Sequence, residues 1–149
     1  MLEFISNEHN LFPTPLWQIQ IKGVDNDAIK EYCYHLKDNT EGVTISNRGG
    51  WHSKEIIQPL PDALTELFTN FEGFVNDYCA QITGLNNLML GNFWVNINQK
   101  YDYNRSHDHQ SSILSGVYYV DCEGDDVGNF VAERDDSAEF FLGTYKNVS

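Results

Sequence analysis

Two stretches of the chain show the three-and-four spacing of apolar residues that is typical of an amphipathic helix. The longer one covers residues 61–82, and Pro61 suits its first turn. Its apolar positions fall on one helical face: Leu64, Leu67, Phe68, Phe71, Phe74, Val75, Tyr78, Cys79 and Ile82. The shorter one covers residues 26–38, where Asp25 or Asn26 can cap the N-terminus by accepting from an unpaired backbone N–H. We expect both faces to pack into a core rather than to bind a cofactor.

After residue 92 the spacing changes to the alternation that is typical of a strand. Phe93, Val95 and Ile97 alternate with Trp94, Asn96 and Asn98. Residues 17–21, 113–121 and 129–133 are further strand candidates, because they also alternate or are rich in β-branched and aromatic residues. Helices followed by antiparallel strands predict an α+β fold, with the helices packed on one face of a sheet.

Composition narrows the class of protein. The chain has 149 residues, 22 acidic against 9 basic ones, and a net charge of −13, which disfavours binding to nucleic acid or to anionic lipid surfaces. Its three cysteines are far apart and form no CxxC pair, so we expect a reducing compartment. The N-terminus is not typical of a signal peptide, and no apolar run approaches the roughly 18 residues of a membrane span. We therefore expect a cytoplasmic protein whose residues 1–149 form a single domain.

The pair His107 and His109 is the strongest candidate for chemistry. On a strand, residues i and i+2 point to the same side with Cα atoms roughly 6.6 Å apart, so two imidazoles can converge on one metal ion while Asp108 points away. Neutral imidazole suits iron, zinc, copper and nickel. The alternative is an exposed turn between two strands that binds nothing.

The other three histidines are not expected to form a site. His35 falls within the first helix, where a core or surface role is the simpler interpretation. His9 and His52 fall in expected loops without a neighbouring cysteine or carboxylate pattern.

The run WVNINQKYDYNRSHDHQSSILSGVYYV, residues 94–120, resembles the 2-oxoglutarate/Fe(II)-dependent oxygenases of phages and marine bacteria, which are distant relatives of prolyl hydroxylases. The resembling features are a Trp-x-Asn strand, an Asn before a His-x-His pair, and then Ser-Gly-Val-Tyr-Tyr. FPTPLW at 12–17 and SNRGGW at 46–51 are similar to further landmarks of the family. The resemblance extends over residues 10–135.

The resemblance implies an antiparallel double-stranded β-helix, similar to a jelly roll, flanked by the N-terminal helices. It implies Fe(II) and the cosubstrate 2-oxoglutarate, with a small molecule or a protein side chain as substrate. His107 matches the first iron ligand of the family and His109 the second, where a carboxylate is more usual. Tyr119 matches a tyrosine that bonds the distal carboxylate of 2-oxoglutarate, and Asn98 is placed near the cosubstrate. Catalytic residues beyond these are not identified.

One departure from the family pattern leaves three alternatives open. The third iron ligand and the arginine that binds 2-oxoglutarate belong to the last strands of the family fold, but after Tyr119 this sequence has no histidine and only Arg134. In the first alternative the sequence is a piece of a longer protein. In the second it is a shortened relative whose sheet is completed by a second copy or a partner chain. The third alternative is a non-catalytic binding or structural module, for example of a phage particle. A phage-encoded protein would be found in the host cytoplasm or the virion.

Overall fold

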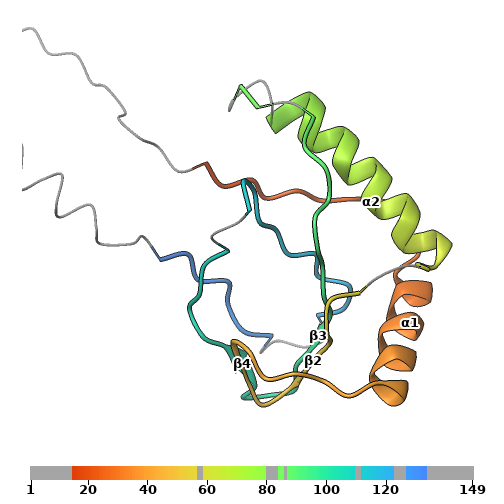
Figure 1. The fold of residues 1–149 in the computed structure, drawn as a ribbon, viewed down its shortest axis with the longest axis vertical. Helices are drawn as coiled ribbons and strands as arrows, with labels where there is room; N and C mark the ends of the chain where they lie inside the picture. Colours follow the sequence, from red (N-terminus) through yellow and green to blue (C-terminus); the bar gives the residue numbers. More distant parts are fainter. Residues whose placement is uncertain are drawn as a thin grey trace, which may run out of the picture.

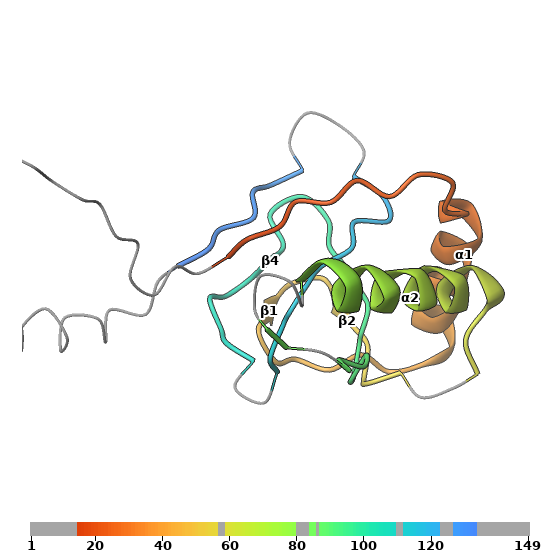
Figure 2. The same cartoon turned by 90° about the horizontal axis from the view of Figure 1, so that it is seen from above.

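The computed structural model describes residues 15–56, 59–79, 84–85, 87–109, 112–122 and 127–133. Over these residues the order is α1 (Asn26–Asn39), β1 (Asn47–Arg48), β2 (Trp51–His52), α2 (Asp62–Phe74), the π-helical turn η1 (Val75–Cys79), β3 (Asn96–Ile97) and β4 (Tyr103–Asn104). In Figure 1 the two helices lie along one side, and the labelled strands lie toward the bottom of the view, with β2 and β3 nearer to α1 than β4. Figure 2 shows how residues 15–25 lead into α1. The mixture of helices and small antiparallel sheets is compatible with the predicted α+β class.

Helix α1 forms where the apolar spacing predicts it. Asp25 is the cap, because its Oδ1 accepts a hydrogen bond from the backbone N–H of Ala28 at 3.0 Å. The apolar face buries Ile29 and Cys33, and burial raises the pKa of the Cys33 thiol because the thiolate is poorly solvated there.

Helix α2 is shorter than the predicted 61–82. Pro61 precedes the helix instead of lying in its first turn, and its carbonyl accepts from the N–H groups of Leu64 and Thr65. After Phe74 the chain widens into η1, where the Asn76 side chain donates to the carbonyls of Glu72 and Leu88. These side-chain bonds tie the widened turn to the segment that follows the helix. Residues 80–82 lie outside the described residues.

The core forms where the two helices meet the extended segments. Its buried members are Ile29 and Cys33 of α1 and Leu64 and Leu67 of α2. Packed against them are Ile21, Val24, Tyr32, Leu60, Ala63, Phe68, Val95, Ile97, Tyr118 and Val120. The predicted helical faces are therefore confirmed at these positions of α1 and α2, whereas Tyr78 of the predicted α2 face is 52% exposed.

The strands form two antiparallel two-stranded sheets. β1 pairs with β4, so that Asn47 lies opposite Asn104, and β2 pairs with β3, so that His52 lies opposite Asn96. Since β1 and β2 are consecutive in the chain, residues 47–52 run alongside residues 96–104 with an interruption at Gly49 and Gly50. Both glycines have positive φ, +68° and +63°, and a Cβ on Gly50 would overlap Oδ1 of Asn98.

Three predicted strands have no ladder partner among the described residues. Residues 17–21, 113–121 and 129–133 contain no strand hydrogen bonds, and the described part of the chain does not form a double-stranded β-helix. Alternation predicts which side chains face the core, but a ladder also needs a neighbouring strand. Residues 118–121 are instead held by α1: the Tyr118 hydroxyl donates to Asn26 Oδ1 at 2.7 Å, and Asp121 pairs with Lys30.

No helix in the described ranges is both long enough and apolar enough to cross a bilayer.

Replacing Gly73 by alanine is expected to stabilise the protein. Gly73 is an exposed helical residue of α2, and a Cβ there would have no atom within 4 Å. Alanine restricts the unfolded chain, so the free energy of unfolding should rise by about 0.5–1 kcal/mol. Urea unfolding measures the change. Gly50→Ala is the matched control and should destabilise, because its φ is positive and its space is filled; a Gly73→Ala variant less stable than the parent would contradict the helix placement.

Candidate functional site

The candidate metal centre lies on the face of β2 and β3 that is turned away from the core. Val95 and Ile97 pack against the helices, so Trp94 and Asn96 point to the opposite side because neighbouring strand residues alternate. His52 lies opposite Asn96 in the register and shares that side. A backbone hydrogen bond extends the pairing of β2 with β3 by one residue, since the N–H of Ser53 donates to the carbonyl of Val95 at 2.9 Å.

Four aromatic rings follow one another across this face. The His52 and Trp94 rings are stacked, with centroids 5.8 Å apart and planes 11° from parallel. Trp94 and His109 follow at 5.3 Å with a tilt of 41°. His109 and His107 are 4.9 Å apart and nearly perpendicular, at 82°. We call these four residues the ring cluster.

The two predicted ligands differ in how their rings are held. Nδ1 of His107 lies 2.7 Å from the carbonyl oxygen of Arg105. A carbonyl only accepts, so Nδ1 carries the proton and the lone pair of Nε2 remains available. No hydrogen bond from a described residue reaches either ring nitrogen of His109, whose half-buried ring is oriented by Trp94 and His107.

The structure brings His107 and His109 together but leaves the two predicted cosubstrate residues apart from them. Asn98 is exposed directly after β3, where its side chain lies against Gly50. Tyr119 is 57% exposed, on the odd-numbered face of residues 113–120 that is turned away from the core. Neither residue shares a ring contact or hydrogen bond with the histidine pair. Their assignment to 2-oxoglutarate stays a prediction.

His52 is the residue that the sequence interpretation misplaced. The sequence predicts a loop at His52, but the residue lies in β2 and is only 4% exposed. Its Nδ1 donates to the carbonyl of Ser53 at 2.6 Å. The pairing of residues 51–53 with residues 95–97 brings its ring against Trp94. This pairing joins segments that are far apart in the sequence. The only related sequence signal is the alternation of residues 94–98, which predicts a strand but not its partner.

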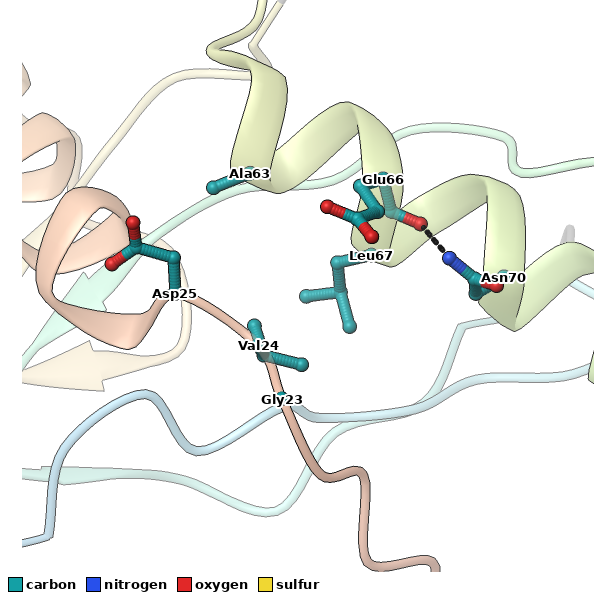
Figure 3. A pocket seen from close by; sticks show the side chains of 7 residues that line it. All are labelled: Gly23, Val24, Asp25, Ala63, Glu66, Leu67 and Asn70. Atoms are coloured by element: carbon teal, nitrogen blue, oxygen red, sulfur yellow. Dashed lines mark hydrogen bonds between the residues drawn. The ribbon is translucent and has the colours of Figure 1, made fainter.

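Two cavities in the described part of the chain lie apart from the histidine pair. Figure 3 shows the smaller one, about 40 Å³, lined by Gly23, Val24, Asp25, Ala63, Glu66, Leu67 and Asn70. Its carboxylates would repel a dicarboxylate such as 2-oxoglutarate, and its volume suits one or two waters. The larger one, about 330 Å³, is an open depression lined by Lys37, Gly50, Trp51, Ile97, Gln99 and Asp102. Neither cavity includes a histidine.

Comparison with known proteins indicates the same family as the motif around the histidine pair. Residues 92–147 match the family described as "Putative 2OG-Fe(II) oxygenase". The match supports the family suggested by the resemblance and includes the histidine pair and Tyr119. No curated protein and no solved structure matches the chain significantly.

The donor chemistry of the pair fits the Fe(II) that the family implies. Imidazole nitrogen is an accepted iron ligand, and a ligand histidine usually donates its other ring N–H to a carbonyl or carboxylate, as His107 does to Arg105. Within the described residues no group of three histidine, cysteine or acidic side chains is assembled that could hold a metal ion.

Proposed function

We propose that this chain is a 2-oxoglutarate- and Fe(II)-dependent oxygenase that hydroxylates a small molecule or a protein side chain. The observation that carries the proposal is the juxtaposition of the His107 and His109 rings, 4.9 Å apart, within the segment that matches the oxygenase family. The net charge of −13 argues against a nucleic-acid substrate.

In this proposal each named residue has one task. Nε2 of His107 and a ring nitrogen of His109 hold the iron, and the Arg105 carbonyl keeps the His107 tautomer fixed. The Tyr119 hydroxyl donates to the distal carboxylate of 2-oxoglutarate, with Asn98 as a second polar contact. When bound there, Fe(II) would supply oxygen activation, and 2-oxoglutarate and dioxygen would be converted to succinate and carbon dioxide with one oxygen atom left on the hydroxylated substrate. The double-stranded β-helix that would surround such a centre is part of the proposal.

The direct test is anaerobic addition of Fe(II) and 2-oxoglutarate to the full chain. A chelated keto acid on iron is expected to give a weak visible charge-transfer band. Succinate omits the keto group and serves as the control ligand. Absence of the band, together with an unchanged unfolding temperature on adding metal, would contradict the proposal.

A second candidate function is a binding or structural module that has kept the oxygenase scaffold without the chemistry. It is favoured by the apolar side chains on the outward face of residues 113–119, where Ile113 and Val117 are 64% and 59% exposed. Unpaired strand edges and exposed apolar side chains favour association with a second copy or a partner chain. This candidate predicts a dimer or larger species by light scattering without any metal dependence.

A further inference from the structure

We propose that Trp94 is a positioning residue that holds the His109 ring in the orientation needed to bind the metal, and that His52 supports the Trp94 indole. This inference rests on the proposed function, because it assigns His109 to the metal. It adds two residues to the site, both on the face of β2 and β3 that is turned away from the core.

The need for a positioning residue follows from the contacts of His109. The His107 ring is fixed by its hydrogen bond to the Arg105 carbonyl, whereas the His109 ring has no such bond from a described residue. An imidazole without an oriented N–H rotates about its side-chain torsions, which weakens metal binding. The indole of Trp94, at 5.3 Å, is the large rigid surface that limits this rotation.

The Trp94 indole is held in place by residues of the paired strands β2 and β3. His52 is buried, its Nδ1 donates to the Ser53 carbonyl, and its ring is stacked on Trp94 at 11° from parallel. Ser53 is 2% exposed, and its hydroxyl accepts from the N–H of Val95, the residue after Trp94. His52 and Trp94 therefore connect the paired backbone of β2 and β3 to the His109 ring through packed, rigid side chains.

The test measures metal affinity rather than turnover. Co²⁺ is the probe, since it accepts the same nitrogen ligands as Fe(II). Trp94→Leu is expected to weaken Co²⁺ binding by roughly three- to tenfold, the range that loss of an aromatic pair gives, while Trp94→Phe should retain most of the affinity. Trp51→Leu is the matched control, because Trp51 is a half-buried tryptophan of β2 outside the ring cluster. It should leave Co²⁺ affinity unchanged.

A second measurement keeps the parent Trp94 in place, in case Trp94→Leu does not fold. In the double variant Trp17→Phe, Trp51→Phe the only remaining tryptophan is Trp94. Co²⁺ held by His109 should quench its fluorescence, and His109→Gln should abolish the quenching.

The outcomes separate this inference from the proposed function. Equal Co²⁺ affinity in the parent and in a folded Trp94→Leu variant would overturn the positioning role alone. Binding without quenching in the single-tryptophan protein would also overturn it, because the metal would then be remote from Trp94. No Co²⁺ binding by the parent chain, with or without 2-oxoglutarate, would overturn both.

Discussion

Replacing His107 or His109 by alanine is expected to abolish the charge-transfer band that Fe(II) and 2-oxoglutarate give with the parent chain. Each substitution removes one of the two imidazoles whose rings lie 4.9 Å apart. Loss of an outer partner of a metal site already weakens binding by about 10- to 100-fold, so loss of a direct ligand should exceed that range. Both rings are at the surface or half-buried, so the unfolding temperature without metal should change little. Anaerobic absorption titration and calorimetry with Co²⁺ measure the effect.

His35→Ala is the control for this prediction. His35 is an exposed histidine of α1 whose Nδ1 is hydrogen-bonded to the side-chain amide of Asn39 in the same helix. This variant should bind metal as the parent does. If His107→Ala and His109→Ala retain parental metal affinity while His35→Ala loses it, the metal site is not the ring cluster.

Replacing Ile29 by alanine is expected to cause the largest loss of stability. Ile29 is 1% exposed and belongs to the buried cluster in which α1 meets α2. Truncating such a residue removes transfer free energy and leaves a cavity, which together cost about 2–5 kcal/mol. That is a large share of the 5–15 kcal/mol that is typical of a domain. Thermal and urea unfolding, followed by circular dichroism, measure the loss.

Ile45→Ala makes the same chemical change at a side chain that is 63% exposed. We expect a change within about 0.5 kcal/mol, as for most surface substitutions. Equal losses at the two positions would show that α1 does not pack on α2 as described.

The candidate site was predictable from the sequence only in part. The spacing of His107 and His109 and the motif around them identify the candidate ligands, because both features are local. The proposed positioning of the His109 ring by Trp94 and His52 depends on the pairing of β2 with β3. No local sequence pattern predicts which segments pair. The alternation of side chains along the extended residues 118–120 also explains why Tyr119 is exposed, since Tyr118 and Val120 occupy the inward positions.

The sequence by itself determined the two helices, most of their apolar positions, a cap at Asp25 or Asn26 and the alternation of residues 93–97, since periodicity and capping act within a few residues. The tertiary structure alone decided where α2 widens into η1 and which predicted strands have a partner. It also decided that His52 is buried against Trp94. These features depend on contacts between residues about 10 to 90 positions apart, whose free energy is set by packing and not by local preference.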